Sequence, residues 1–382
     1  MATSLALVLC ANRTRARTNF TPAVRSIVVD SKKTSHDVVV LAGGVGAARF
    51  LRGLALVNEA RATTAIVNTG DDTILHGLNI SPDIDTVIYT LASAIDSERG
   101  WGLGGETWRA MESLKRYAKV RPANSVAAPE WFNLGDQDLA THFYRTSRRG
   151  EGATATEITR EIADAWSLEQ KIIPMTDHDV ATVVELAEDC IAGKSGARIS
   201  FQEYFVKYKH SVAVRSIDFV GIEQATPNGL THLTDADVIV IAPSNPIVSI
   251  GPIRAMKLLE KKLVEKRNRI VAISPIVGGH AIKGPADRLL NELGHESSAL
   301  GVARIYASIA ATLIIDDVDA HLKPAIEDLG MNCVVTNTIM SSPEVSANLA
   351  STTINSVLKP VLKSVLNPVL NPDSAKKQAG NS

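Results

Sequence analysis

The sequence has little of what marks several large protein classes. Its three cysteines, Cys10, Cys190 and Cys333, are scattered, which argues against a disulfide framework or a zinc site and fits a reducing compartment. No apolar run approaches the roughly 20 residues of a membrane helix. The net charge is only −1, so no broad surface for nucleic acid or an anionic membrane is expected. We therefore expect a cytoplasmic protein without a nucleic-acid or membrane partner.

Several catalytic motifs are missing as well. The nucleophile turn G-x-S-x-G does not occur, and no pair among the nine histidines has the H-E-x-x-H spacing of a zinc site. The stretch "GKS" (193–195) lacks the glycine that a P-loop requires five residues before Gly193, where Glu188 stands. A turn is the better interpretation of that stretch.

Short apolar runs indicate the fold class. Each run is continuous rather than alternating, which predicts strands buried on both faces of a parallel sheet, and helical patterns lie between them. The sequence thus predicts an α/β fold with a Rossmann-like, doubly wound, mostly parallel sheet. The predicted strands are Val38–Ala42, Ala65–Asn68, Val238–Ala242, Ile270–Ser274, Leu313–Ile315 and Cys333–Thr336.

Two stretches interrupt this alternation. Residues 106–168 are predicted to form a mostly helical insertion, in which Thr154 and Glu157 have the spacing of a capping box. Farther along, Thr182–Asp189 and Ile199–Val206 are separated by turn residues and predict a β-hairpin.

The two ends of the chain differ in composition from its middle. Residues 1–36 are rich in Ser, Thr and Arg; this fits an organellar transit peptide, but we favour a disordered extension. Residues 37–350 are expected to form a single α/β domain. Residues 351–382 are expected to form a low-complexity tail, because the prolines of "VLKPVLKSVLNPVLNP" (357–372) should prevent a long regular helix.

Polar or glycine-rich segments directly follow four of the predicted strands. Ligands of open α/β sheets bind beyond the carboxyl ends of the strands, so these segments should converge at one edge of the sheet. This convergence is stronger evidence for a site than any single motif. The segments are "GGVGAARF" (43–50), "NTGDD" (68–72), "PSNPIVSIGPI" (243–253) and "PIVGG" (275–279).

The first segment is a glycine turn that leads into a helix. Gly44 and Gly46 match the first two positions of the dinucleotide fingerprint, but Arg49 stands at the third, which disfavours NAD. The backbone N–H groups at Gly43, Gly44 and Gly46 are instead suited to a diphosphate at a helix N-terminus. The alternative is a tight turn with only a structural role.

The second segment and the residues after it hold four acids, Asp71, Asp72, Asp83 and Asp85. Such an excess of carboxylates near a phosphate site is explained if Mg²⁺ lies between them, since this cation prefers carboxylate and phosphate oxygens. The alternative is that Asp83 or Asp85 merely caps the helix that follows. We favour capping for Asp83 and a functional role for Asp71 and Asp85.

The third and fourth segments add polar groups at the same edge. Ser244, Asn245 and Ser249 lie between prolines that stiffen the loop, which suits nucleotide recognition or a rigid turn. Lys283 follows the fourth segment and is a candidate phosphate contact, although a lone lysine is more often solvated.

These motifs, in this order, resemble those of the 2-phospho-L-lactate transferases, which make the deazaflavin coenzyme F-420. The resemblance covers roughly residues 37–350. It rests on "LAGGVGAARFLRGL", "NTGDD…HGL…SPDIDTVIYTL", "RGWGL…ETW", "WFNLGDQDLATH", "PMTD", "SFQEYFV", "APSNPIVSIGPI" and "SPIVGG".

The resemblance implies an enzyme, usually a homodimer, that uses Mg²⁺ to transfer a phospho-acyl group. The donor is linked to guanosine diphosphate, the acceptor is the deazaflavin precursor Fo, and GMP is released; lactyl, enolpyruvyl and glyceryl donors all remain open. By motif position, the resemblance implies that Gly43, Gly44 and Gly46 bind the diphosphate and that Ser244 and Asn245 bind the guanosine. It also implies that Asp71 and Asp85 bind the metal and that Asp85 and Asn133 contact Fo. Asp85 is in addition the expected catalytic residue.

Two other hypotheses compete with this one. Nucleotide-sugar-binding regulators of the same superfamily share a similar glycine turn, bind UDP-sugars and turn nothing over. The "WFNLGDQDLATH" motif and the tryptophans 101, 108 and 131 favour the transferase. An NAD dehydrogenase is disfavoured because Arg49 stands where the dinucleotide fingerprint requires its third glycine. His178 stands where the resemblance would place a second Asp, which leaves the role of that position open.

Overall fold

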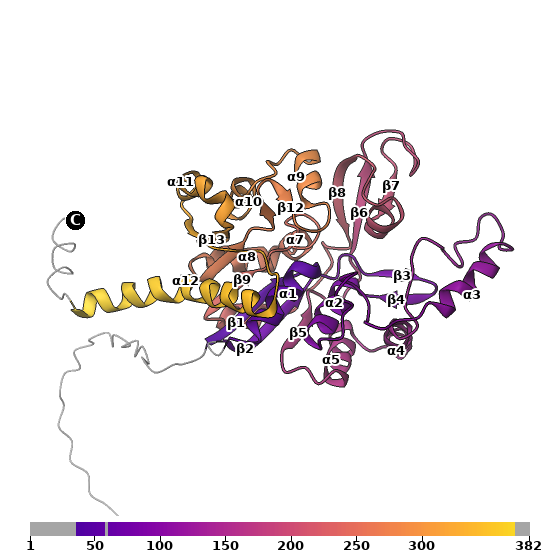
Figure 1. Ribbon diagram of the computed structural model, residues 1–382, viewed down its shortest axis with the longest axis horizontal. Helices are drawn as coiled ribbons and strands as arrows, with labels where there is room; N and C mark the ends of the chain where they lie inside the picture. Colours follow the sequence, from indigo (N-terminus) through magenta and orange to yellow (C-terminus); the bar gives the residue numbers. More distant parts are fainter. Residues whose placement is uncertain (1–35, 58–59, 371–382) are drawn as a thin grey trace, which may run out of the picture. The chain divides into compact units, whose positions relative to one another are not determined.

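The protein is built around a seven-stranded sheet in which neighbouring strands are parallel (Figure 1). The structure is a computed structural model that describes residues 36–57 and 60–370. All six predicted strands are confirmed; the seventh, β5, has only four residues and was not predicted. The strands across the sheet are β14 (Asn332–Val335), β13 (Thr312–Ile315), β10 (Ile270–Ile273), β9 (Val238–Ile241), β1 (His36–Ala42), β2 (Ala60–Val67) and β5 (Lys171–Pro174).

The strand order reverses at β1. The chain proceeds from β1 through β2 to β5 on one side, and then adds β9, β10, β13 and β14 in turn on the other side. This is the Rossmann-like arrangement predicted from the sequence, and ligands of such sheets bind beyond the carboxyl ends near the reversal. Because the strands are parallel, the segments that follow β1, β2, β9 and β10 lie at one edge of the sheet.

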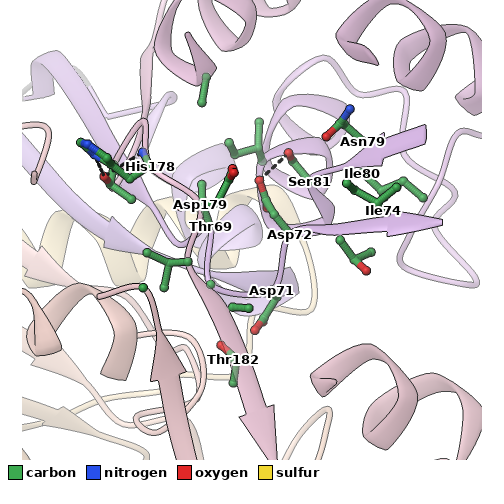
Figure 2. A pocket seen from close by; sticks show the side chains of 18 of the residues that line it. Thr69, Asp71, Asp72, Ile74, Asn79, Ile80, Ser81, His178, Asp179 and Thr182 are labelled. Atoms are coloured by element: carbon green, nitrogen blue, oxygen red, sulfur yellow. Dashed lines mark hydrogen bonds between the residues drawn. The ribbon is translucent and has the colours of Figure 1, made fainter. Parts of the chain in front are cut away.

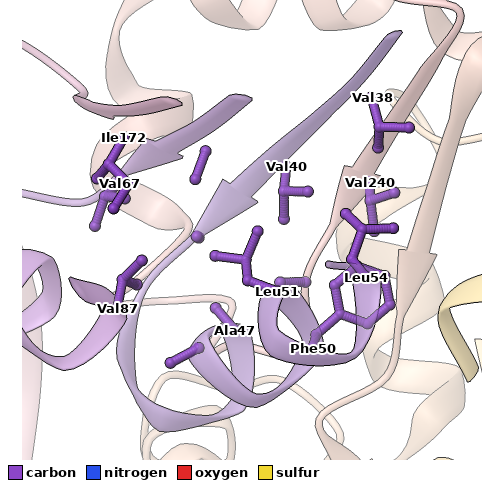
Figure 3. Packing of buried hydrophobic residues seen from close by; sticks show 14 of the residues in the cluster. Val38, Val40, Ala47, Phe50, Leu51, Leu54, Val67, Val87, Ile172 and Val240 are labelled. Atoms are coloured by element: carbon purple, nitrogen blue, oxygen red, sulfur yellow. The ribbon is translucent and has the colours of Figure 1, made fainter. Parts of the chain in front are cut away.

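Helices cover both faces of the sheet. Along β1, Val38 and Val40 belong to one apolar cluster (Figure 3), and Val39 and Leu41 belong to the other. The continuous apolar run is therefore buried on both sides. The first cluster includes α1 (Gly44–Leu54), α2 (Pro82–Leu91), α5 (Ala155–Ala165) and α12 (Pro343–Leu370); the second includes α6 (Leu230–Asp235), α7 (Gly251–Ala255), α8 (Lys257–Glu265), α9 (Ala286–Glu292), α10 (Ala299–Tyr306) and α11 (Lys323–Glu327).

A smaller antiparallel sheet contains β7 (Arg198–Ser200), β6 (Ala181–Leu186) and β8 (Val214–Val220), in that order. The predicted hairpin is confirmed by the pairing of β6 with β7. The prediction that its second strand continues to Val206 was wrong, because the chain forms a helical turn over Glu203–Lys207. Phe201 and Tyr204, three residues apart, both belong to an apolar cluster under this sheet, and a helical turn allows this.

The stretch 106–168 contains α3 (Arg109–Ala118), α4 (Asp138–Gly150) and α5, and the short hairpin of β3 (Thr73–Leu75) and β4 (Leu78–Ile80) packs against α4. The starts of α3 and α4 cap each other. The Glu106 carboxylate accepts hydrogen bonds from the first N–H groups of α4, at 2.8 Å each, while Asp136 accepts from those of α3. The predicted capping box at α5 is also present.

The prediction for the C-terminal stretch was wrong in one respect. Helix α12 continues through Pro360 and Pro368 to Leu370, although a proline inside a helix costs about 3 kcal/mol. The first half of the helix is anchored: Leu349 and Ile354 are buried, and Gly53 of α1 lets Ser346 approach within the space a Cβ would occupy. The predicted extension 1–36 lies outside the described residues except for His36. Among the described helices, none has the length and apolarity needed to cross a bilayer.

Candidate active site

A cavity of about 560 Å³ lies at the carboxyl ends of β2 and β5 (Figure 2). One wall is the segment that follows β2, predicted from the sequence to carry the acids. The opposite wall is the segment between β5 and β6 together with the start of the turn after β7. Residues of α4 and α5 complete the lining. The cavity is therefore placed where a doubly wound sheet binds its ligands.

Four buried oxygen atoms of the cavity wall have no hydrogen-bond partner among the described residues. Two are carboxylate oxygens, Oδ1 of Asp71 and Oδ1 of Asp72, and two are the hydroxyl oxygens of Thr69 and Thr182. Figure 2 shows that the Asp71 side chain points toward Thr182, whereas the Asp72 side chain points the other way, toward Ser81. Buried polar atoms are nearly always paired. The Thr182 hydroxyl lowers the pKa of Asp71 and so lies close to its carboxyl group, whereas the free oxygen of Asp72 is a place for a ligand that binds oxygen.

The carboxyl groups of this wall bind protons unusually tightly. Burial raises the pKa of Asp72 to about 8, against a weaker opposing effect of the 2.7 Å hydrogen bond from the Ser81 hydroxyl. Burial, followed by the charge of Asp83, raises the pKa of Asp71 well above its usual range. The amide of Gln202 donates to the backbone oxygen of Asp71 at 3.1 Å and so fixes this segment. A bound cation would relieve this crowding of negative charge.

Asp83 does not cap its own helix, contrary to the prediction. Its Oδ1 accepts a 2.8 Å hydrogen bond from the backbone N–H of Gly44, at the start of α1, and its Oδ2 accepts a 2.9 Å bond from the Asn68 amide. The first turn of α2 is thereby tied to the glycine turn. Burial raises the pKa of Asp83 to about 6. Its carboxylate occupies the position at a helix N-terminus where an anion is favoured.

The glycine turn is closely packed against the loop that follows β9. A Cβ on Gly43 would lie 2.7 Å from the Cβ of Ser249, and one on Gly46 would lie 2.2 Å from the backbone oxygen of Pro243. Gly44 has φ +69°, which favours glycine. These glycines thus allow two strand-end loops to touch, and none of them lines the 560 Å³ cavity.

Ser244 and Asn245 belong to that same loop. The Ser244 hydroxyl donates to the backbone oxygen of Gly43 at 2.8 Å, which locks the loop to the glycine turn. The Asn245 side chain accepts from the N–H of Ile247 at 2.9 Å, while its own Nδ2 is buried without a partner among the described residues. The Asn245 amide therefore has a donor left for a ligand at the β1–β9 reversal.

Asp85 is not grouped with Asp71. Both of its carboxylate oxygens accept hydrogen bonds from the guanidinium of Arg145, one at 3.1 Å and one shorter, and both side chains are buried. Arg145 borders the cavity, whereas Asp85 lies behind it. No three acidic, histidine or cysteine side chains of the described residues converge as a metal site. The pairing of Asp71 with Asp85 as metal ligands stays a prediction.

Arg145 is itself held by a buried chain of polar groups. The Tyr89 hydroxyl donates to Asp138 Oδ1 at 2.7 Å, Asp138 Oδ1 lies 3.4 Å from His142 Nε2, and His142 Nδ1 lies 3.1 Å from Arg145 Nη1. A guanidinium only donates, so Nδ1 accepts in this contact, while Nε2 is buried without a hydrogen-bond partner among the described residues. Sequence reasoning missed this chain, although 138, 142 and 145 share one helical face.

A family model described as "2-phospho-L-lactate transferase CofD" matches residues 38–318. The chain belongs to this family. It is therefore a CofD-type transferase of coenzyme F-420 biosynthesis, with one substrate that donates a group and one that accepts it.

Curated relatives of this CofD-family chain support the assignment. Proteins named phosphoenolpyruvate transferase are 41% identical over 316 residues in Streptomyces griseus, 38% over 318 in Nocardia farcinica and 38% over 327 in Mycobacterium tuberculosis. These alignments cover 82%, 83% and 82% of this chain and 96%, 93% and 96% of the relatives, respectively.

Solved structures share the fold. Protein BH3568 of Bacillus halodurans superposes with a TM-score of 0.52 at 15% identity, covering 84% of this chain and 99% of the other. A second structure of the same protein, described as a member of the UPF0052 family, gives a TM-score of 0.51 at 14% identity over the same shares. At this identity the likeness concerns the fold alone.

Two further predicted positions of the CofD-family motif lie apart from the acids. Asn133 is exposed in the loop before α4 and does not line the cavity. His178 lines the cavity, and its Nδ1 accepts a 3.2 Å hydrogen bond from the N–H of Thr226. His178 thus joins the cavity wall to the segment after β8. The resemblance would place an Asp at this position, and in this chain the histidine makes a structural contact there.

Proposed function

We propose that the protein transfers a phosphoenolpyruvyl group from a guanosine diphosphate-linked donor to the ribityl hydroxyl of Fo and releases GMP. The relatives' printed name supports the enolpyruvyl group over the lactyl and glyceryl alternatives. The observation that carries the proposal is the set of four oxygens without a hydrogen-bond partner in the cavity at the ends of β2 and β5, because transfer of a phosphoryl-type group depends chiefly on positioning and charge.

Magnesium fits this group of oxygens. Mg²⁺ is typically bound by one or two carboxylates together with substrate phosphates and water, and Asp71 and Asp72 each offer one free oxygen, on opposite sides of the segment after β2. We propose these two residues as the protein's ligands, in place of Asp71 with Asp85. Bound there, the cation would offset the negative charge that builds up on the transferring group.

The reaction we propose is an in-line displacement. The hydroxyl oxygen of Fo forms a bond to the phosphorus that carries the enolpyruvyl group, and the bond from that phosphorus to the oxygen of GMP breaks. The electron pair leaves with GMP, and the hydroxyl proton passes to a carboxylate of the acidic wall. Most of the rate would come from alignment of the two substrates.

Arg145 and Arg149 give the cavity a cationic side opposite the acids. Arg145 is fixed by Asp85, so its guanidinium is presented at the wall without freedom to move away. Arg149 pairs at 2.5 Å with Asp179, whose side chain is 92% exposed, and is held less firmly. We propose that Arg145 orients an anionic part of a substrate and that Asp85 acts as its positioning residue rather than as a catalytic base.

A turnover assay with mass-spectrometric detection tests the proposal. Purified protein, Mg²⁺ and Fo are mixed separately with the enolpyruvyl, lactyl and glyceryl donors. We expect GMP release and an Fo product bearing phosphoenolpyruvate, formed fastest from the enolpyruvyl donor. No product from any donor, together with tight binding of a UDP-sugar, would instead support the regulator hypothesis.

We also propose that the enzyme is a homodimer and acts in the cytoplasm, as the family resemblance implies. Light scattering after size-exclusion chromatography tests the first point. A mass near twice 40.8 kDa is expected, and a monomer mass at working concentrations would contradict it.

A further inference from the structure

The guanidinium of Arg145 has two N–H groups that the protein leaves unused. Nη1 donates to Asp85 Oδ2 and to His142 Nδ1, each at 3.1 Å, and Nη2 donates to Asp85 Oδ1. These contacts use three of the five N–H groups of a guanidinium. The two that remain are Nε–H and the second N–H of Nη2. Because the group is planar, these two lie side by side along one edge, as a fork that matches two coplanar oxygen atoms.

This free edge is open to the cavity. Arg145 lines the cavity, although its side chain is only 7% exposed. Its Nε has no hydrogen bond to any described residue, yet it is not one of their buried atoms without a partner. The small surface that this side chain exposes therefore includes Nε, beside space that a ligand can fill.

His142 fixes the direction of the free edge. Its ring is 1% exposed, and Nδ1 accepts the Nη1 hydrogen of Arg145 that Asp85 does not use. On the other side of the ring, Asp138 Oδ1 lies 3.4 Å from Nε2 and accepts the Tyr89 hydroxyl at 2.7 Å. All of these groups are buried. With Asp85 and His142 both in place, the guanidinium cannot turn in its plane without breaking a buried hydrogen bond, which is unfavourable.

The chemistry of the edge indicates what it binds. Two parallel N–H groups match the oxygens of a carboxylate or a phosphate, whereas a carbonyl or a hydroxyl would use only one of them. The charge of Asp85 offsets that of Arg145, so the fork contributes direction more than net charge. A donor with an acyl group on a diphosphate carries both kinds of oxyanion, and Fo carries neither.

We propose that the Nε–Nη2 edge of Arg145 binds two oxygens of one oxyanion of the donor, and that His142 is the positioning residue of this edge. The oxyanion is either the carboxylate of the acyl group or the phosphate that is transferred. The proposal rests on the proposed function only in naming the donor. His142 does not line the cavity and acts through Arg145. Its loss should therefore weaken binding of that oxyanion and leave the rest of the nucleotide site unchanged.

Binding of the enolpyruvyl donor, of GDP and of GMP, measured by calorimetry with Mg²⁺ and without Fo, tests the site in the absence of turnover. His142→Leu removes the acceptor at Nδ1, whereas His142→Asn keeps an acceptor near that position. We expect His142→Leu to weaken donor binding about 10-fold, which corresponds to about 1.4 kcal/mol, and His142→Asn to recover most of that loss. GMP binding should stay within about twofold of wild type in both variants.

Two tyrosines supply a matched pair of further variants. Tyr89→Phe removes the hydroxyl that holds Asp138 beside the ring and should weaken donor binding in the same direction, but less. Tyr144→Phe also removes a hydroxyl that donates to a carboxylate, that of Glu161 at 2.8 Å, but this tyrosine is 45% exposed. Donor binding by Tyr144→Phe should stay within about twofold of wild type.

The three ligands separate the two oxyanions, because GDP lacks the acyl group and GMP lacks the transferred phosphate as well. Weaker donor binding with unchanged GDP binding identifies the carboxylate. Weaker binding of both, with GMP unchanged, identifies the phosphate. Donor affinity within about twofold of wild type in His142→Leu would overturn the proposal, and so would an equal loss for all three ligands, which a structural role alone predicts. Equal losses in His142→Leu and His142→Asn would reject Nδ1 as the positioning acceptor.

A second variant keeps the test decisive if circular dichroism shows that His142→Leu does not fold. Arg145→Lys keeps the charge but has no fork, so it should weaken donor binding about 10-fold, and unchanged donor affinity would overturn the proposal. Failure of the proposed function is distinguishable from this result. A selective loss of donor affinity in variants of a protein that shows no turnover would keep the oxyanion site while rejecting the transferase reaction.

Discussion

The guanidinium of Arg145 binds both carboxylate oxygens of Asp85, and each side chain is only 7% exposed. A buried carboxylate paired in this way is already neutralised. It is therefore poorly suited to bind a second cation. This relationship supports our proposals that Asp85 stabilises the cavity wall and that the metal ligands are Asp71 and Asp72.

Asp85→Asn should be both destabilising and inactivating. It leaves the Arg145 charge buried without a partner, and breaking one side of a buried pair costs about 3–5 kcal/mol. We expect the free energy of unfolding, measured in urea, to fall by that amount, and turnover to fall far more than GDP affinity. Asp218→Asn removes a surface pair with Arg198 and should cost about 1 kcal/mol or less. Wild-type turnover in Asp85→Asn would refute the role.

Arg145→Lys should separate geometry from charge. Lysine keeps the charge but cannot bind both oxygens of Asp85 in one plane or reach His142 in the same way. We expect kcat to fall at least about 10-fold, whereas Arg149→Lys, at the more exposed pair with Asp179, should change it about twofold or less. Equal effects in steady-state kinetics would show that only charge matters at this wall.

Magnesium affinity should depend on the two free carboxylates. In calorimetry with GDP present, Asp71→Asn and Asp72→Asn should each weaken Mg²⁺ binding about 10-fold or more, because each removes a charged oxygen ligand. Asp218→Asn again serves as the control. Unchanged affinity in both wall variants would place the metal elsewhere.

Stability without metal should fall as the pH rises. The pKa of Asp72 is about 8 in the folded protein and near 4 when unfolded, so between these values the folded state holds the extra proton. Each pH unit in this window then lowers the free energy of unfolding by up to about 1.4 kcal/mol per such group. Denaturant titrations from pH 5 to 8 in a chelating buffer should show this slope, and Asp72→Asn should reduce it. An equal slope in the variant would contradict the assignment.

Gly46→Ala should disrupt the contact between the glycine turn and the loop after β9. The added methyl would lie 2.2 Å from the Pro243 oxygen, so one of the two backbones must shift. We expect a loss of about 2 kcal/mol or more in unfolding free energy, together with weaker GDP binding. Gly150→Ala, which has open space around it, should be neutral or slightly stabilising. Identical stability of the two variants would argue against the close packing.

The sequence was sufficient to predict the parallel sheet and the edge of the sheet at which the acidic residues lie. Continuous apolar runs such as Val38–Ala42 are buried on both faces, which is the physical reason they predict parallel strands. The acids after β2 were found because a strand end and a local excess of charge are both visible in the chain. The hairpin and the capping box depend on neighbouring residues and were predicted for the same reason.

Contacts between distant segments were not predictable. The ion pair of Asp85 with Arg145 joins α2 to α4, and the bond from Gly44 to Asp83 joins two helices, so neither has a local signal. Helix α12 was missed because proline disfavours helix locally, while packing against α1 supports the earlier turns.

The most direct test of the account is the turnover number of the double variant Asp71→Asn, Asp72→Asn, with Fo, the enolpyruvyl donor and Mg²⁺. Circular dichroism and urea unfolding would establish that the variant is folded. If the oxygens at the end of β2 are the reaction site, formation of phosphoenolpyruvyl-Fo should fall by about 100-fold or more relative to wild type. A turnover number within twofold of wild type would contradict the account.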